Sequence, residues 1–127
     1  MFKDTPAFSG FSVDKLDAAK TFYHDTLGLE VEDGPMGLGL KLAGGGRVFI
    51  YDKPDHKPAE FTILNFPVDD IDEAVDELAS RGVRFERYDG FPQDEKGVMR
   101  GIAAGQGPDI AWFKDPSGNV LSVLQES

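Results

Sequence analysis

The sequence predicts an α+β fold in which two copies of a β-α-β-β-β unit make up one domain of 127 residues. The first observation is an internal repeat, because residues 11–19 read FSVDKLDAA and residues 66–74 read FPVDDIDEA, 55 positions later. The second is that each copy runs from a short strand pattern into a helical pattern. The third is a hydrophobic content of 40%, including ten Phe, which is enough to fill a core.

The helix of each copy has an apolar face at helical spacing. We expect Asp14 and Asp69 to cap the helix N-termini, because an aspartate oxygen can accept hydrogen bonds from first-turn amides. Gly28 and Gly82 are expected to end the helices. The apolar face consists of Leu16, Ala19, Phe22, Tyr23 and Leu27 in the first copy, and of Ile71, Ala74, Val75 and Leu78 in the second.

Each predicted helix is followed by a strand and then by a hairpin. The strands are expected at Leu29–Glu32 and Val83–Arg87. Aligning the hairpin glycines Gly46 and Gly118 places Val48 on Val120 and Ile50 on Ser122.

Two segments lack such patterns. The polar stretch Asp52–Glu60 reads as a linker between a first module of about residues 1–55 and a second of about residues 60–127. Asp89–Pro108 is predicted to be a long loop, which either covers a ligand or lies on the surface.

Composition excludes several functions. The chain has no cysteine, so disulfides, thiol catalysis and cysteine-bound zinc are ruled out. A net charge of −10 disfavours binding to nucleic acid. Neither a signal peptide nor a membrane-spanning stretch is apparent, so we expect a cytoplasmic protein with no membrane partner.

The segments SVDKLDAAKTFYHDTLGLEV and FKDPSGNVLSVLQ, together with the repeat, resemble the vicinal oxygen chelate superfamily. This superfamily includes glyoxalase I, extradiol dioxygenases, and fosfomycin- and bleomycin-resistance proteins. The resemblance covers nearly the whole chain. It implies two βαβββ modules that form a curved, partly open sheet around a cleft, commonly in a homodimer. It does not decide between catalysis and binding.

The resemblance also implies where metal ligands would lie. Metal-dependent members place His, Gln or Glu on four strands that face the cleft. The matching positions here are Phe8, Ile50, Ile63 and Ser122. Phe and Ile have no donor atom, and one Ser hydroxyl does not hold a divalent ion. We therefore expect no metal and no cofactor. His24 and His56 lie outside these strands and are expected on the surface.

Strand alternation from these positions predicts a largely apolar cleft wall. The residues expected to bind a ligand are Phe8, Ser12, Val48, Ile50, Phe61, Ile63, Asn65, Val120, Ser122 and Leu124. The residues expected beneath the helices are Phe11, Val13, Phe49, Leu64, Phe66, Leu121 and Val123. The alternative is that the wall residues fill a closed core. The face of Trp112 stays open, and Tyr88 and Arg100 are expected at the cleft rim or on the surface.

Two functions fit these observations. The first is a metal-free protein that binds a small apolar or aromatic molecule, of the resistance or sequestration type. The alternative is a glyoxalase- or dioxygenase-type enzyme of the same superfamily. No catalytic residue is identified, because no nucleophile-base pair, paired carboxylates or phosphate-binding loop stands out.

Overall fold

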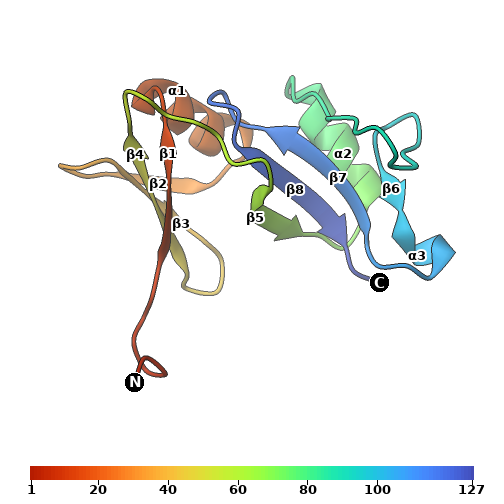
Figure 1. Cartoon of the computed structure of the whole chain (residues 1–127), viewed down its shortest axis with the longest axis horizontal. Coiled ribbons are helices and arrows are strands. Elements are labelled where there is room, and N and C mark those ends of the chain that lie inside the picture. The colour runs from red at the N-terminus through yellow and green to blue at the C-terminus, as the bar shows by residue number, and fades with distance from the viewer. The chain divides into compact units, whose positions relative to one another are not determined.

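The computed structural model describes all residues, 1–127, as two compact units, Met1–Lys57 and Pro58–Ser127. Each unit contains one four-stranded sheet with helices (Figure 1). The boundary between the units falls inside the predicted linker, because Asp52–Glu60 contains both Lys57 and Pro58. None of the helices has the length and apolar character that a membrane span requires.

The N-terminal unit contains sheet A, with strand order β1-β4-β3-β2. Strand β1 is parallel to β4, and the other neighbours are antiparallel. The elements are β1 (Ser9–Val13), α1 (Leu16–Lys20), η1 (Thr21–Thr26), β2 (Glu30–Asp33), β3 (Leu38–Lys41) and β4 (Arg47–Asp52). The predicted strand at Leu29–Glu32 corresponds to β2, one residue later.

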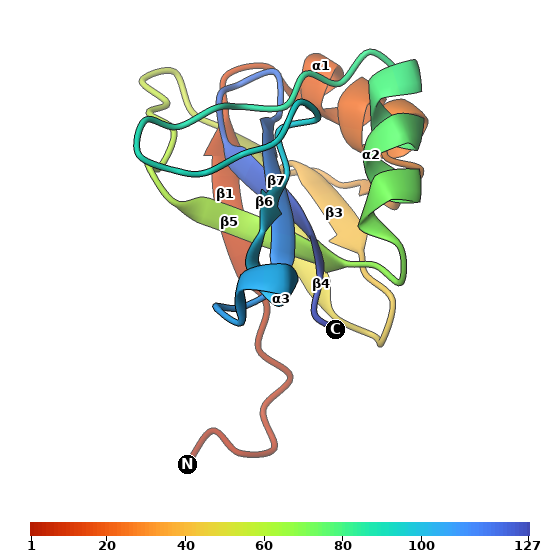
Figure 2. The same ribbon diagram turned by 90° about the vertical axis from the view of Figure 1, so that its right-hand side faces the viewer.

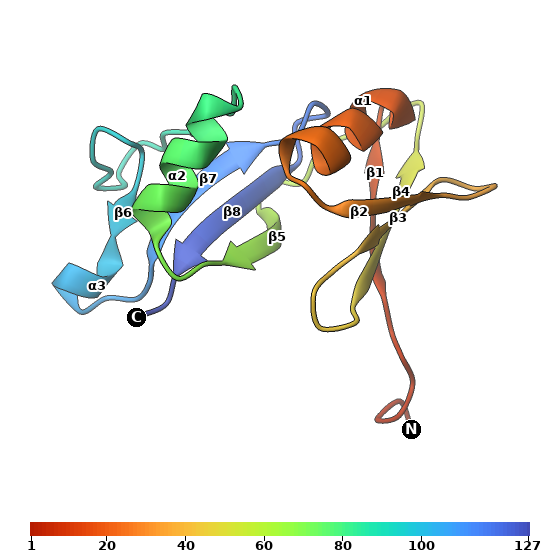
Figure 3. The same cartoon turned by 180° about the vertical axis from the view of Figure 1, so that it is seen from behind.

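The C-terminal unit contains sheet B, with strand order β5-β8-β7-β6. Its elements are β5 (Thr62–Pro67), α2 (Ile71–Ser80), β6 (Met99–Arg100), α3 (Gly101–Ala104), β7 (Asp109–Lys114) and β8 (Val120–Gln125). The first and last strands are again parallel, so both units share one topology. The predicted α+β fold of two βαβββ modules is confirmed. Helix α2 lies in front of β7 and β8 in Figure 3.

The prediction of a strand at Val83–Arg87 is wrong, because no strand forms between α2 and β6. Only Phe85 forms a bridge, to Phe113, and Glu86 N donates a single hydrogen bond to Trp112 O at 2.8 Å. Pairing with β7 resumes only at Met99. The edge position is taken by β6, which comes from the segment predicted as a loop. Figure 2 shows β6 running beside β7 and leading into α3.

The helix starts lie one residue later than predicted. Helix α2 is capped by Asp70, whose side chain accepts a hydrogen bond from Glu73 N at 3.1 Å. The cap is therefore not Asp69. The equivalent residue of the first repeat is Lys15, which makes no side-chain cap bond, so Asp14 is not the cap of α1. A side-chain cap is thus established for the second helix, at Asp70.

The helix ends agree with the prediction, but the first helix changes type. Gly28 and Gly82 follow the helices with φ of 73° and 90°, the left-handed conformation that glycine adopts without strain. Over Thr21–Thr26 the first helix widens to a π-helix, and Leu27 N donates to Phe22 O at 3.0 Å. The wider turn is compatible with the same apolar face.

In sheet A, the side chains of β4 face the opposite way from the prediction. Phe11 contacts Tyr23 of η1 with ring centroids 5.9 Å apart, and it lies opposite Ile50 in the β1-β4 ladder. Ile50 is 0% exposed, and Val48, two residues before it, is also buried. Both side chains therefore face the helix and not the opposite face on which they were predicted, and whether either residue contacts a ligand stays a prediction. Phe49, predicted beneath the helix, faces the other way.

The hairpin explains this error. In sheet A the turn closes with a hydrogen bond from Leu42 N to Gly46 O, and in sheet B the equivalent bond joins Asp115 N to Asn119 O. Gly46 therefore corresponds to Asn119 and not to Gly118. A one-residue shift in register moves every side chain of a strand to the other face.

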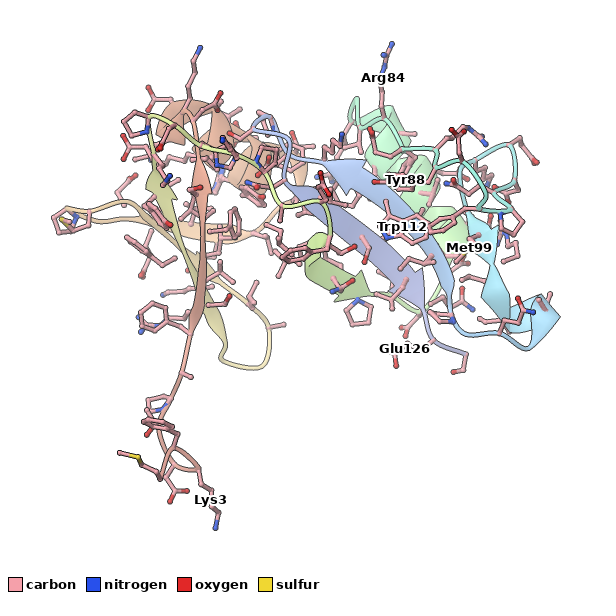
Figure 4. The ribbon with its side chains drawn as sticks, in the orientation of Figure 1. Lys3, Arg84, Tyr88, Met99, Trp112 and Glu126 are labelled. Carbon is pink, nitrogen blue, oxygen red and sulfur yellow. The ribbon has the colours of Figure 1, made fainter.

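In sheet B, the predicted faces are correct for most positions. Asn65 lies opposite Ser122, and Ser122 lies opposite Trp112, so these three side chains share one face. Phe113 lies opposite Leu121, and both are buried. In Figure 4, which has the orientation of Figure 1, Trp112 points toward the viewer, while α2 lies behind the sheet. The face opposite the helix is called the open face of each sheet below.

The β7-β8 turn is held by a buried aspartate. Asp115 is 4% exposed, and one of its oxygens accepts hydrogen bonds from Ser117 N and Asn119 N, each at 2.9 Å. Its other oxygen accepts from the Asn119 side-chain amide at 2.9 Å. Residues Asp115–Asn119, which lie in the segment FKDPSGNVLSVLQ, therefore fix the hairpin and through it the position of Ser122.

We predict that Asp115→Ala lowers the free energy of unfolding by about 3 kcal/mol, because three donors lose a buried carboxylate acceptor. Urea unfolding measures this change. Asp115→Asn, which keeps one oxygen for the backbone amides, should lose less. Equal stability of the two variants would contradict this role for the carboxylate.

Candidate ligand-binding surfaces of the two sheets

An aromatic wall, made of Tyr88, Phe91 and Trp112, covers part of the open face of sheet B. Its ring centroids lie 5.6 Å apart for Tyr88 and Trp112, 5.4 Å for Phe91 and Trp112, and 5.8 Å for Tyr88 and Phe91. Phe91 is 47% exposed, so a ligand can reach the wall. In Figure 4, Tyr88, Met99 and Trp112 lie on the same side of the sheet. Trp112, whose face the sequence left open, therefore lies on the open face of sheet B, with Tyr88 beside it.

Gln93 holds the loop that carries two of these rings. Its side-chain amide donates to Glu86 O at 2.9 Å and to Gly97 O at 2.8 Å. Its side-chain oxygen accepts from Tyr88 N at 2.8 Å. The Gln93 side chain therefore links the two ends of the loop and fixes the backbone position of Tyr88. No sequence pattern indicated this role.

Arg100 anchors the same loop on the opposite side of β6. Its guanidinium makes two hydrogen bonds to Asp72 of α2, at 2.8 and 3.1 Å, and a third to Asp94 at 3.0 Å. Lys96 also contacts Asp72, at 3.3 Å. Asp94 further accepts hydrogen bonds from two loop amides, including Val98 N at 2.9 Å. Arg100 thus joins the loop to the helix, and Asp94 and Lys96 belong to the same network.

A polar pair lies next to the aromatic wall. The Ser122 hydroxyl donates to Asn65 Oδ1 at 2.5 Å, and Ser122 lies opposite Trp112 in the β7-β8 ladder. Ser122 is buried, whereas Asn65 is exposed and can present its amide group to a ligand. Burial, with a smaller contribution from Glu86, raises the pKa of Tyr88, so its hydroxyl stays protonated at neutral pH.

The other predicted wall residues of sheet B take different positions. Val120 and Leu124 lie on the open face by alternation with Ser122. Phe61 precedes β5 and is 70% exposed. Ile63 is the extra residue where the β5-β8 register shifts, because Thr62 pairs with Val120 and Leu64 with Leu121. Whether any of these residues binds a ligand stays a prediction.

The open face of sheet A carries a second aromatic pair. Phe49 and Tyr51 stack with centroids 5.9 Å apart and an interplanar angle of 17°. Ser12, which lies opposite Tyr51, forms a hydrogen bond of 2.6 Å with Nδ1 of His56. The linker histidine therefore folds back onto β1, which the sequence did not indicate. Phe8, just before β1, is exposed.

The residues at the implied metal positions do not fit a divalent ion. After the register correction, these positions are Phe8, Phe49, Ile63 and Ser122. Three have no donor atom, and the Ser122 hydroxyl already donates to Asn65. No group of three or more His, Cys, Asp or Glu side chains is placed to hold a metal. The donor set therefore disagrees with metal chemistry at these positions.

The sequence pattern of the Glyoxalase/Bleomycin resistance protein/Dioxygenase superfamily matches residues 9–123. The chain belongs to this superfamily. The match spans both units and therefore includes both repeats. No functionally curated protein matches the sequence.

Solved structures with the same fold cover almost the whole chain. TnmS3, an antibiotic binding protein from Streptomyces sp. CB03234, is 25% identical over 98% of each chain, with a TM-score of 0.64. A superfamily member from Sphaerobacter thermophilus is 27% identical over 94% of this chain and 96% of its own, with a TM-score of 0.67. A glyoxalase family protein from Enterococcus faecalis, 23% identical over 97% and 98% with a TM-score of 0.67, shows the fold alone.

The Arg100 network predicts a specific pH dependence. Hydrogen bonds from Arg100 and Lys96 lower the pKa of Asp72 from 3.8 to about 2. A lowered pKa means that the stabilisation is present above the unfolded value of 3.8 and is lost as the pH falls through about 2. Because Asp72 is half exposed, Asp72→Asn should cost less than about 1 kcal/mol at pH 7.

Urea unfolding of the wild type and Asp72→Asn between pH 7 and pH 2 measures this difference. It should shrink toward zero at the lowest pH, while Asp69→Asn, at an exposed position without an ion pair, should show little difference throughout. A difference that is the same at pH 7 and pH 2 contradicts the proposed ionic origin.

Proposed function

We propose that this protein is a metal-free binder of a small apolar or aromatic molecule, of the resistance or sequestration type. The observation that carries this proposal is the aromatic wall of Tyr88, Phe91 and Trp112 on the open face of sheet B. An exposed ring such as Phe91 stays in contact with water in the free protein. A flat ligand that covers the wall removes this apolar surface from water, which favours binding.

The neighbouring polar groups would orient such a ligand. Each aromatic contact contributes about 0.5 to 1.5 kcal/mol beyond the apolar area that it buries. The Asn65 amide and the Tyr88 hydroxyl add hydrogen-bonding groups at the edge of the wall. An apolar surface with a few fixed polar groups is typical of small-molecule sites. The name of TnmS3, an antibiotic binding protein with the same fold, supports a binding role.

A glyoxalase- or dioxygenase-type activity is the alternative, and the donor set argues against it. Enzymes of this kind need nitrogen or oxygen donors to hold a metal that polarises the substrate. Phe8, Phe49 and Ile63 occupy positions where such donors would lie. A protein that only binds its ligand does not need these metal-holding donors.

We predict that the purified protein retains well below one divalent ion per chain after incubation with nickel, zinc, manganese and iron and then dialysis. Elemental analysis measures the bound metal. The expected reason is that the chain lacks a donor set of the required type. Near-stoichiometric metal that is lost on substitution of an open-face residue would overturn the metal-free proposal.

We also predict that a screen of aromatic natural products yields ligands that raise the melting temperature. A ligand at 100 times its Kd stabilises the fold by about 2.7 kcal/mol, a shift on the order of 10 °C for a domain of this size. Trp112→Leu should strongly reduce the shift because it removes the central ring of the wall.

Phe85→Leu is the matched control, since Phe85 contacts Phe113 on the other face of sheet B. This variant should lower the melting temperature of the free protein but keep the ligand-induced shift. Hits that stabilise the Trp112→Leu variant as much as the wild type would place the binding site elsewhere.

The homodimer, which the superfamily resemblance implies, and the cytoplasmic location stay predictions. The exposed side chains of Phe8 and Phe61 and the edge strands β1 and β5 are features that a second chain could cover. Sedimentation at micromolar concentration measures the association state. A 13.9 kDa species alone would count against the dimer.

A further inference from the structure

A hollow of about 140 Å³ lies on the open face of sheet A. All of its lining residues belong to the N-terminal unit, so it shares no residue with the aromatic wall. Two rings, two cations, one carboxylate and one glycine supply most of its lining: Phe8, Glu32, Gly39, Lys41, Arg47 and Phe49. This combination of apolar and positive groups is unusual in a chain with a net charge of −10.

The positive charges in the hollow are not equivalent. Lys41 forms an ion pair of 2.8 Å with Glu32 and lies 3.9 Å from Glu30. Arg47 lies opposite Lys41 in the β3-β4 ladder and makes no ion pair. Its guanidinium instead lies over the Phe8 ring, 5.8 Å from the centroid. The uncompensated charge in the hollow is therefore that of Arg47, and Phe8 helps to hold it in place.

The space between these groups results from Gly39. Gly39 lies opposite Phe49 on one side and Glu32 on the other, so all three positions share the open face. A Cβ atom at Gly39 would meet no atom within 4 Å, which shows that the sheet is bare there. A cavity of about 150 Å³ can hold a benzene ring. The hollow is thus of the right size for one six-membered ring.

We propose that this hollow binds a small aromatic carboxylate, with the ring over Gly39 beside Phe49 and the carboxylate on Arg47. A planar guanidinium can donate two parallel hydrogen bonds to a carboxylate, which favours this anion over a neutral group of the same shape. The pairing of Glu32 with Lys41 reduces repulsion of the anion. The site adds a second binding surface and does not depend on the proposed function of sheet B.

The test is an NMR titration of the ¹⁵N-labelled protein with sodium benzoate and, separately, with benzamide at equal ionic strength. Benzoate should shift the amide signals around Gly39, Lys41 and Phe49 and should bind about fivefold more tightly than benzamide, the scale expected for an exposed ion pair. Arg47→Gln should remove this preference. Arg84→Gln, which makes the same charge change at an exposed position of the C-terminal unit, should preserve it.

Gly39→Val supplies a steric control, because a Cβ atom at this position meets no atom within 4 Å, and valine occupies space in the hollow and suits a strand. Neither compound should bind this variant. Equal affinity for benzoate and benzamide, unchanged selectivity in Arg47→Gln, or no shifts in sheet A would overturn the proposal. Shifts that disappear in Trp112→Leu would also overturn it, while leaving the proposed function of sheet B intact. Conversely, if the screen finds no ligand for sheet B, benzoate should still bind to the hollow of sheet A.

Discussion

The parallel pairing of the first and last strands of each unit decides which side chains can meet a ligand. Phe11 lies opposite Ile50 in sheet A, and Phe66 lies opposite Val123 in sheet B. Because alternate residues of a strand point to opposite faces, these two pairs set the orientation of both strands along their length. The helices cover one face of each sheet, so the same register leaves Phe49 and Ser122 on the open faces.

Hairpin geometry determines that register. Two hairpins with the same number of residues between their closing hydrogen bonds can carry glycine at different positions. In sheet B the buried Asp115 carboxylate organises the turn, whereas in sheet A the turn is a run of glycines without such a side chain. Glycine is therefore a poor marker for aligning the repeats, and the backbone hydrogen bonds are a reliable one.

The two open faces differ chemically although their strands share one topology. Sheet B has a wall of three rings beside a Ser-Asn pair, held by Gln93 and Arg100 through hydrogen bonds that the sequence does not reveal. Sheet A has a stacked pair of rings and an unpaired arginine beside a bare glycine. Duplication thus supplied one framework, and separate side-chain sets give each sheet a different binding character.

The sequence by itself determined the repeat, the α+β fold, the superfamily and the lack of a His, Gln or Glu at Phe8, Ile63 and Ser122, three of the implied metal positions. These features depend on local periodicity and on residue identity, which are visible in one dimension. Tertiary structure decided the faces of Val48, Ile50 and Trp112, the strand β6 and the return of His56 to Ser12. Each of these depends on a hydrogen-bond register or on contacts between residues distant in the chain, so composition and spacing do not contain them.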